Sequence, residues 1–435
     1  MNIINKLVIL CIGIFSIGFA AKLKEIPVIL HQPDGSSIEA YSSGDEFYVR
    51  LHTEDNYTII QSEVDGYYYY AMQDNKNVVP SEFRADSNLP ENVSIHPEIR
   101  ISREEYLQRR DRFKVRNGSR DAPTIGTINN INIFIRFADE GEFGTPRYLM
   151  DEPFNKPEGP SIKHYFDEVS YSLLEVNTLH YPVCDMSTNV SYQDVHPRSY
   201  YQPYNAQTNP DGYTDANVTI REHTLLKNAV EFVSGEIPLE LDVDGNDDGW
   251  VDNVTFLVSG SPDGWSDLLW PHRWSLFSFN VYINGAVVDA YNLNLASGGY
   301  FNVGTLCHEF FHSLGAPDLY HYAGSGPTAA GGWDIMDGSG DTPQYMSAWM
   351  KHKYGNWIDC PEISQMGIYP LLPLQYQDNS CFRLASPNSN TEFFVVEYRK
   401  KEGIYEINTP GNDSGMLIYR INANLNGNAN GPPDE

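Results

Sequence analysis

The chain has 435 residues, of which 41% are hydrophobic and 20% are charged, as is usual for a globular protein. This length allows two or three domains and a sizeable core. The formal net charge of −29 argues against nucleic acid as a partner, because phosphate binding needs clustered Lys and Arg. The acidic balance fits a soluble secreted protein, although it says little about catalysis.

The first twenty residues predict a secretory signal peptide. Lys6 supplies a positive charge, and the apolar run over 7–19 is shorter than the ~20 residues that a membrane span needs. Gly18 and Ala20 are small residues that suit cleavage after Ala20. An uncleaved anchor helix is the alternative. We therefore expect a secreted, extracellular protein without stable membrane insertion once residues 1–20 are removed.

Residues 21–123 are predicted to form a small β-rich domain and a linker. Segments rich in Tyr, Val and Ile are separated by the turn signals PDG (33–35), SGD (43–45) and VDG (64–66). The stretch 101–123 is charged and helix-prone in its first half, and then loose, as an exposed linker would be. Arg116 and Arg120 are candidate protease cleavage points, and an ordinary solvated linker explains this composition equally well.

The rest of the chain is predicted to mix helices and strands, which gives an α+β fold class with a mixed sheet. Between residues 124 and 359 the expected elements are strands at 131–137 and 254–260 and helices at 161–176 (at least its first three turns) and 219–233. Leu225, Ala229 and Phe232 form the apolar side of the last helix. Residues 360–435 form a β-rich segment with strands at 381–386, 392–400 and 415–421. This segment ends without a terminating element, which suggests truncation of a longer chain.

Four cysteines remain after Cys11 leaves with the signal peptide: Cys184, Cys307, Cys360 and Cys381. In an exported chain they permit two disulfide bonds in three connectivities. Cys360 with Cys381 is the simplest pair, because both lie in one strand-and-turn region. Cys307 directly precedes a histidine and can instead be a buried free thiol.

The segment HEFFHSLGAPD, residues 308–318, carries the strongest functional pattern. Residues four apart lie on one face of an α-helix, so His308 and His312 can offer two imidazoles to one cation. Zn²⁺ binds such nitrogens at ~2.0–2.1 Å, and catalytic zinc sites keep one position open for water. Glu309 lies at the edge of the same face, where its carboxylate can reach that water as a general base. A core helix with two structural histidines is the alternative.

Asp318 is the predicted third metal ligand. Gly315 is expected to end the helix in a left-handed conformation, and Pro317 prevents the helix from resuming. The chain then turns back and brings the Asp318 carboxylate toward the histidines. No Glu occurs between Ser313 and Pro361, which argues against enzymes that take a Glu ligand from a downstream helix.

Three carboxylates further along the chain are rival third ligands: Asp334, Asp337 and Asp341. They lie in or beside GGWDIMDGSG, residues 331–340. A Met between turn residues after such a zinc motif resembles the Met-turn of metzincins, in which the side chain forms an apolar floor beneath the zinc. Met336 would have that place here, and an ordinary buried Met is the alternative.

VGTLCHEFFHSLGAPDLY (303–320) and GGWDIMDGSG together resemble the immune inhibitor A family of secreted metalloproteases. Four further segments agree with the resemblance: IKHYFDEVSYSLLEV (162–176), DLLWPHRWSL (267–276), MSAWMKHKYGNW (346–357) and EFFVVEYRKKEG (392–403). The resemblance covers roughly residues 131–422. The zinc motif is its specific part, and the other segments are supportive.

This resemblance implies a zincin- or metzincin-like catalytic domain over 124–359, with a mixed sheet and an active-site helix. It also implies a zinc endopeptidase made as a precursor, because QPDG and GDEFY near the N-terminus resemble the propeptide of bacterial members. The family's zinc ligands correspond to His308, His312 and Asp318, and its general base corresponds to Glu309. Residues 21–183 contain no Cys, so latency would need a carboxylate or steric cover in place of a blocking thiolate.

A second metal site is predicted in LDVDGNDDGWVDN, residues 241–253, whose spacing resembles a calcium loop. The candidate Ca²⁺ ligands are Asp244, Asn246, Asp248, Trp250 (through its carbonyl) and Asp252. The bidentate Glu at position twelve is missing, because Thr255 stands there. An acidic surface turn is the alternative.

The sequence therefore predicts a secreted zinc-dependent endopeptidase that acts on proteins or peptides and in which Glu309 activates water for attack on the peptide bond. An inactive, protease-like secreted binding protein is the alternative, and an exopeptidase or zinc amidase is also compatible with the motif. His272, in WPHRW, is expected to be a structural histidine.

Overall fold

The computed structural model describes residues 23–45, 47–75, 77–90, 93–112, 122–261, 268–320 and 329–425. Within these ranges the chain forms two six-stranded sheets, a two-stranded sheet and a three-stranded sheet, together with helices. This mixture agrees with the predicted α+β class. The signal-peptide prediction and the candidate cleavage points Arg116 and Arg120 lie outside the described residues.

The N-terminal sheet is an antiparallel meander in which each strand pairs with the next one along the chain. Its strands are β1 (Leu23–His31), β2 (Ser37–Asp45), β3 (Tyr48–His52), β4 (Thr58–Gln61), β5 (Tyr68–Asp74) and β6 (Asn77–Arg84). Two of the predicted turns connect strands, and their glycines, Gly35 and Gly66, have φ of 85° and 75°. Helix α1 (Arg103–Arg112) follows, in the half of the linker that was expected to be helical.

The central sheet has the order β11-β14-β10-β7-β8, and β9 also pairs with β7. These strands are β7 (Gly126–Arg136), β8 (Leu174–Tyr181), β9 (Tyr192–Gln193), β10 (Val254–Val258), β11 (His272–Ser275) and β14 (Ala290–Leu295). Edge strand β11 is antiparallel to β14, and the other pairs are parallel, so the sheet is mixed as predicted. A small hairpin, β12 (Val281–Ile283) and β13 (Ala286–Val288), precedes β14.

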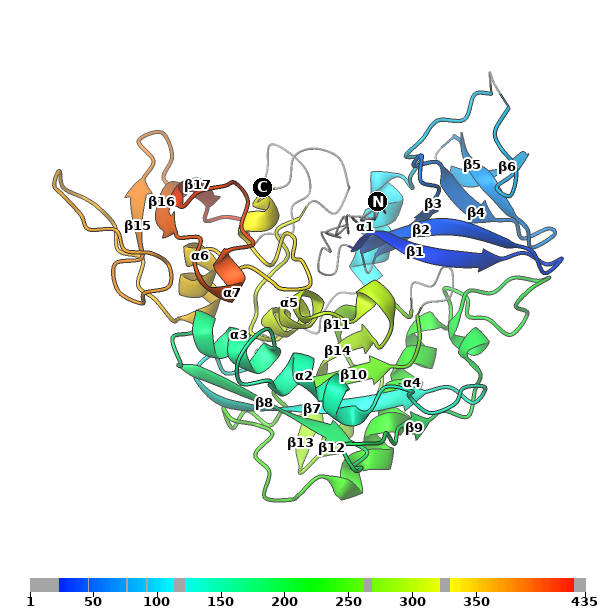
Figure 1. The fold of residues 1–435 in the computed structure, drawn as a ribbon, viewed down its shortest axis with the longest axis horizontal. Coiled ribbons are helices and arrows are strands. Elements are labelled where there is room, and N and C mark those ends of the chain that lie inside the picture. The colour runs from blue at the N-terminus through cyan, green and yellow to red at the C-terminus, as the bar shows by residue number, and fades with distance from the viewer. Residues whose placement is uncertain are drawn as a thin grey trace, which may run out of the picture.

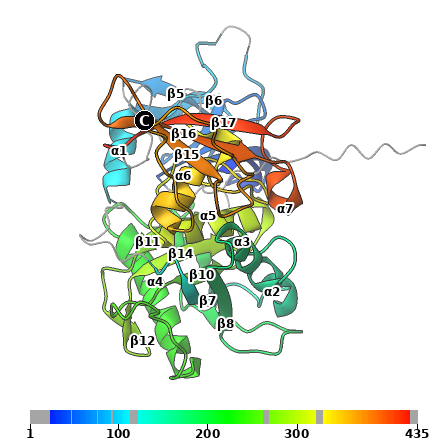
Figure 2. The same cartoon turned by 90° about the vertical axis from the view of Figure 1, so that its left-hand side faces the viewer.

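Helices cover both faces of the central sheet (Figure 2). Helix α4 (Val218–Val233) lies on one face, and α2 (Arg147–Asn155), α3 (Ile162–Val169) and α5 (Val303–Ser313) lie on the other. Strand β7 is buried on both sides as predicted, because Ile131, Ile133 and Ile135 pack in the core that contains α4, while Phe134 packs in the core that contains α5. No helix in the described ranges is long and apolar enough to cross a bilayer.

Two details of the predicted helices were wrong. The helix predicted over 161–176 ends at Val169, because Tyr171 and Ser172 adopt positive φ and the chain enters β8 at Leu174. Phe232 was expected on the apolar side of α4, but its side chain is 55% exposed and contacts the ring of Tyr192.

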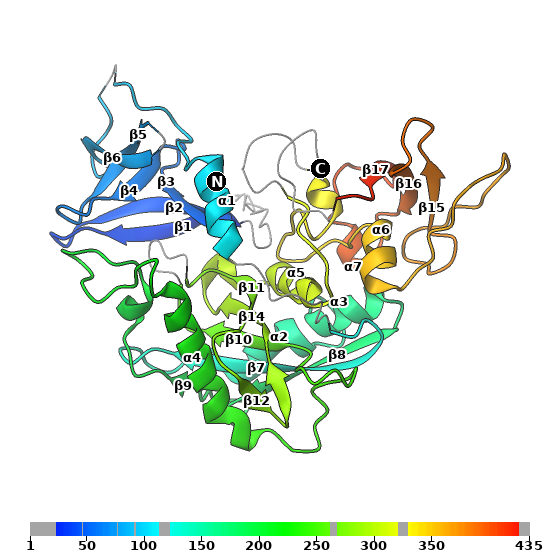
Figure 3. The same cartoon turned by 180° about the vertical axis from the view of Figure 1, so that it is seen from behind.

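The three predicted C-terminal strands are present, and they form an antiparallel sheet in the order β15-β16-β17. They are β15 (Cys381–Ala385), β16 (Glu392–Arg399) and β17 (Gly415–Asn422), with the short helices α6 (Ala348–Met350) and α7 (Gly403–Glu406) beside them. Val395 and Tyr405 belong to the same hydrophobic core as Phe310 of α5. The N-terminal and C-terminal sheets lie on opposite sides of the molecule, and α5 lies between them (Figures 1 and 3).

Cys184, Cys307, Cys360 and Cys381 are free thiols in this structure. A hydrogen bond between the thiols of Cys360 and Cys381 lowers the pKa of Cys360, so the simplest predicted pair lies in contact. A disulfide bond between them stays a prediction. Cys307 is fully buried, and burial raises its pKa well above the usual range, which fits an inert thiol.

Lys351 is a buried cation at the junction between α3 and the C-terminal sheet. Its Nζ donates a hydrogen bond to the Tyr171 hydroxyl (3.1 Å) and lies 4.3 Å from the ring centroid of Tyr345. Burial lowers its pKa from 10.5 to about 7, although Glu406 acts in the opposite direction. Between these two pH values the unfolded chain therefore binds more protons at this group than the folded chain does.

We expect the free energy of unfolding to rise as the pH increases from about 7 toward 10.5, because deprotonation removes the cost of a buried charge. The contribution is at most on the order of 5 kcal/mol. Urea unfolding at several pH values would measure the rise, which Lys351→Met should abolish. Lys353→Met, at an exposed neighbouring position, is the control and should leave the rise intact.

Candidate metal centre

Helix α5 ends at Gly315, as the sequence predicts, and begins after Asn302. Asn302 caps its N-terminus, since the side-chain oxygen accepts a hydrogen bond from the Thr305 N–H (2.8 Å). Gly315 ends the helix with a φ of 92°, and its N–H donates to the His312 carbonyl (3.0 Å). The stripe opposite the histidines, formed by Leu306, Phe310 and Leu314, is buried and fixes the helix against the core.

The three predicted ligand atoms, two from α5 and one from the turn after it, lie close together. Oδ1 of Asp318 lies 3.0 Å from Nε2 of His308 and 3.2 Å from Nε2 of His312, and the two nitrogens are 3.1 Å apart. Ligand atoms at the corners of a tetrahedron around zinc are about 3.3 Å apart. Among the described residues, this is the one group of three or more His, Cys, Asp or Glu side chains with ligand atoms within 4.8 Å of one another.

Backbone carbonyls orient both histidine rings. Nδ1 of His308 lies 3.0 Å from the carbonyl oxygen of Ile335, and Nδ1 of His312 lies 2.7 Å from that of Ala316. A carbonyl oxygen can only accept, so each Nδ1 carries a proton, and the Nε2 of a neutral ring directs its lone pair toward the shared space. Two lone pairs and a carboxylate that face one another repel unless a positive charge lies between them. The donor set therefore fits a zinc ion.

The electrostatics of the pocket lead to the same conclusion. Burial lowers the pKa of His308, but the Asp318 carboxylate outweighs burial and raises it to about 9. Burial raises the pKa of Asp318, and the two histidines outweigh it and hold that pKa well below its usual range. The pocket thus attracts positive charge, which a proton or a metal ion can supply.

Glu309 is 1% exposed and interacts electrostatically with all three candidate ligands. Its Oε1 has no hydrogen-bond partner among the residues that the structure describes. Burial raises its pKa, while the charges of His308 and His312 act in the opposite direction. A buried carboxylate oxygen without a partner is costly, and such atoms in a cleft are candidates for proton transfer.

The rival carboxylates have other partners. Oδ2 of Asp334 accepts a hydrogen bond from the Ser347 N–H (2.7 Å), and Oδ2 of Asp337 accepts from the Ala330 N–H (2.6 Å). Asp341 is exposed. Asp334 and Asp337 thus stabilise the backbone of the segment after the motif. None of the three rival carboxylates belongs to the metal-binding group described above.

Met336 lies in that segment, fully buried in the same hydrophobic core as Phe310. Its carbonyl accepts a hydrogen bond from the N–H of Leu319 (2.8 Å), the residue after Asp318. The preceding carbonyl, of Ile335, holds the ring of His308. The turn around Met336 therefore supports two of the three candidate ligands through its backbone.

A buried polar network that sequence reasoning missed joins α5 to the central sheet. Asn292 of β14 donates to the Glu309 carbonyl (2.8 Å), and Ser313 at the end of α5 donates to Asn253 (2.7 Å). Asn253 in turn donates to Asn130 of β7 (2.7 Å). Asn residues inside otherwise apolar strands could have indicated this network, because buried amides need hydrogen-bond partners.

His272 has the structural role that was expected. Its Nδ1 lies 2.7 Å from the Trp270 carbonyl oxygen, and its Nε2 lies 3.1 Å from Oε1 of Glu222, which also accepts from the Tyr291 hydroxyl. Both ring nitrogens are therefore engaged. Burial lowers the pKa of His272, but Glu222 outweighs burial and raises it. No sequence pattern indicated that Glu222 of α4 would be its partner.

The acidic loop at residues 241–253 is closed by hydrogen bonds from its own backbone. Carboxylates accept from nearby N–H groups in these pairs: Asp244 from Asp248 (2.9 Å) and Gly249 (2.8 Å), Asp248 from Trp250 (2.9 Å), and Asp252 from Gly245 (3.0 Å). Asn246 accepts from the Asp248 N–H at 3.3 Å. Burial, aided by the neighbouring carboxylates, raises the pKa of Asp252 to about 7. A cation would relieve this repulsion, and calcium binding here stays a prediction.

The N-terminal sheet reaches the vicinity of the metal centre. Phe47, in the β2–β3 connection, packs edge-on against Tyr106 of α1 with ring centroids 5.8 Å apart. Both side chains form a buried cluster with Tyr320. The Tyr320 ring stacks near that of His308, with ring centroids 6.3 Å apart and planes inclined by 27°. A contact between the N-terminal sheet and the residue two positions after Asp318 is thus part of the fold.

No protein-family model and no curated protein matches this chain. Among solved structures, the chain is similar to the crystal structure of wild-type OgpA from Akkermansia muciniphila at 10% sequence identity. That similarity covers 71% of this chain and 89% of the other, with a TM-score of 0.29. A likeness this weak carries no conclusion about fold or function.

Proposed function

We propose that this protein is a zinc-dependent endopeptidase of the immune inhibitor A type, with a metzincin-like catalytic domain, made as a secreted precursor. One observation carries the proposal. Three side chains of metal-binding types, His308, His312 and Asp318, converge with ligand atoms within 4.8 Å of one another and with Nδ1 of both rings held by backbone carbonyls, and the buried carboxylate of Glu309 interacts electrostatically with all three. Substrates would be proteins or peptides.

Zinc, when bound, supplies a Lewis acid that polarises water and the scissile carbonyl. The chain's own residues provide the rest of the chemistry. His308, His312 and Asp318 would hold the ion, while Glu309 accepts a proton from the attacking water. The water oxygen forms a bond to the scissile carbonyl carbon, and as the C–N bond breaks, Glu309 returns its proton to the leaving nitrogen. The products are a carboxylic acid, which then ionises in water, and an amine.

The test measures the bound zinc and the casein hydrolysis of wild type and of His312→Ala. We expect about one zinc per chain and casein hydrolysis in wild type. Both should be lost in the variant, because two ligands remain where catalytic zinc takes three. Short amino-acid anilides assayed beside casein separate an endopeptidase from an exopeptidase. Casein hydrolysis by a metal-free wild-type protein would contradict the proposal.

The alternative is a secreted binding protein on an inactive protease scaffold. Such a protein would lack part of the ligand set or the base, and here the three ligand side chains form one group with which the buried Glu309 carboxylate interacts electrostatically. Wild-type protein that binds zinc and cleaves no protein, even after removal of the N-terminal sheet, would favour this alternative.

The proposed precursor leads to a further prediction. Weakening the contact of Phe47 and Tyr106 with Tyr320 should raise casein hydrolysis by the uncut chain, because this contact joins the N-terminal sheet to the metal centre. The double variant Phe47→Ala with Tyr106→Ala is compared with Val64→Ala, which is 85% exposed in the turn between β4 and β5. Equal rates in the two proteins would contradict a role of this contact in latency.

A further inference from the structure

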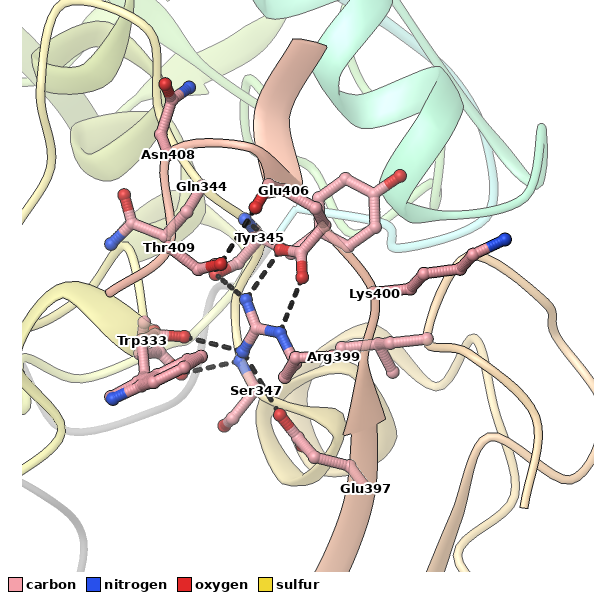
Figure 4. A network of polar contacts seen from close by, with 12 residues as sticks. Trp333, Gln344, Tyr345, Ser347, Glu397, Arg399, Lys400, Glu406, Asn408 and Thr409 are labelled. Carbon is pink, nitrogen blue, oxygen red and sulfur yellow. Dashed lines mark hydrogen bonds and ion pairs between the residues drawn. The ribbon is translucent and has the colours of Figure 1, made fainter. Parts of the chain in front are cut away.

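Arg399, near the end of β16, is a buried cation at the centre of a polar network (Figure 4). Its Nε and Nη2 donate to the two carboxylate oxygens of Glu406 at 2.7 and 2.6 Å, so the pair is bidentate. Its Nη1 donates to Oε1 of Glu397 at 3.1 Å. Such a guanidinium is held in a fixed orientation, because its fork matches the carboxylate.

The same network binds backbone groups at both ends of the segment 333–348. Nη1 of Arg399 donates to the Trp333 carbonyl at 2.7 Å. Oε1 of Glu406 accepts from the Tyr345 N–H at 3.2 Å, and Oε2 of Glu397 accepts from the N–H of residue 348 at 2.6 Å. Side chains of the C-terminal sheet and of α7 thus fix the ends of a segment that has little regular structure of its own.

Two backbone carbonyls inside that segment support the metal ligands. The Ile335 carbonyl is two residues beyond the Trp333 carbonyl, and it holds Nδ1 of His308 at 3.0 Å. The Met336 carbonyl accepts from the N–H of Leu319, beside Asp318, at 2.8 Å. A shift at Trp333 would therefore be transmitted to one ligand ring directly and to a second ligand through its neighbour.

We propose that Arg399 is a positioning residue for the metal centre: it holds the turn that orients His308 and places Asp318. This inference rests on the proposed zinc function. Buried ion pairs add little net stability compared with apolar residues of similar size, so stability alone does not account for a buried cation shared by two carboxylates and a carbonyl. A role in holding the hydrogen-bonding partners of the metal ligands accounts for the buried Arg399, because loss of such partners typically costs 10–100-fold in metal affinity.

The experiment measures zinc affinity by chelator competition on the full chain, together with urea unfolding and steady-state kinetics. Arg399→Lys keeps the charge but cannot reach Glu406 bidentately and Trp333 at once. Arg147→Lys is the matched control, because Arg147 is equally buried but bonds to Asn189 and the Val190 carbonyl, away from the metal ligands. We expect roughly 10-fold or greater loss of zinc affinity in Arg399→Lys, with lower kcat and unchanged KM, and no change of affinity in the control.

Glu406→Gln, which weakens the same fork without removing Arg399, provides a second variant in case Arg399→Lys folds poorly. It should also lower zinc affinity. Retention of wild-type zinc affinity by either folded variant, or equal loss in Arg147→Lys, would overturn the proposal while leaving the zinc function in place. A wild-type chain that binds no zinc would overturn both.

Discussion

Glu309→Gln is expected to lower casein hydrolysis by at least about 10²–10⁴-fold while leaving bound zinc unchanged. The amide has nearly the same shape as the carboxylate but cannot accept the proton of the attacking water. Oε1 of Glu309 has no hydrogen-bond partner among the described residues, so the substitution breaks no bond that holds the fold there. Initial rates and metal analysis on the same protein samples would measure both outcomes.

Glu158→Gln, at an exposed position, is the control for the loss of one negative charge. It should leave both the rate and the zinc content at wild-type values. Two outcomes would contradict the assignment of the base. One is a Glu309→Gln protein with wild-type activity, and the other is a protein that loses zinc together with activity, since Glu309 would then act as a ligand.

Gly304→Ala, in the first turn of α5, is expected to destabilise the protein and weaken zinc binding. Helix propensity alone favours Ala over Gly by ~1 kcal/mol. A Cβ at this position, however, would collide with the Gly340 carbonyl and the Ser339 Oγ. Overpacking of this kind costs about 1–3 kcal/mol, so the steric cost is expected to win. The displaced residues belong to the segment that holds the ring of His308, so zinc affinity should fall as well.

Gly235→Ala is the matched control, because a Cβ there meets no described atom within 4 Å and the residue needs no positive φ. Thermal unfolding and chelator competition on both variants would test the prediction. A Gly304→Ala protein that is more stable than wild type would show that the neighbouring turn can move without cost.

The parts of the site that could be predicted from sequence depend on short separations. His308, Glu309 and His312 share one helix, and the left-handed Gly315 returns the chain so that Asp318 follows within one turn. Helical periodicity and one glycine conformation are enough to bring these groups together.

The parts that could not be predicted depend on pairs far apart in the chain. Glu222 meets His272 across 50 residues, and Ser313 meets Asn253 across 60. Which partner a buried polar side chain finds is decided by the order of strands in the sheet, and local patterns carry no information about that order. The early end of α3 has a different cause, because positive φ at Tyr171 and Ser172 is unusual for such residues and leaves no clear sequence signal.

The C-terminal strands share a core with α5, and this arrangement has a consequence for how the protein folds. His164 of α3 is hydrogen-bonded to Tyr405, 241 residues later, and the Trp357 indole donates to the Thr124 carbonyl across 233 residues. Contacts of such sequence separation form late and slowly, because the loop between them must first be closed. The chain is synthesised from its N-terminus, so α5 is made before the C-terminal strands that share its core. The surroundings of this helix are therefore completed last. The candidate metal centre can take its final shape only after the C-terminal strands have been synthesised.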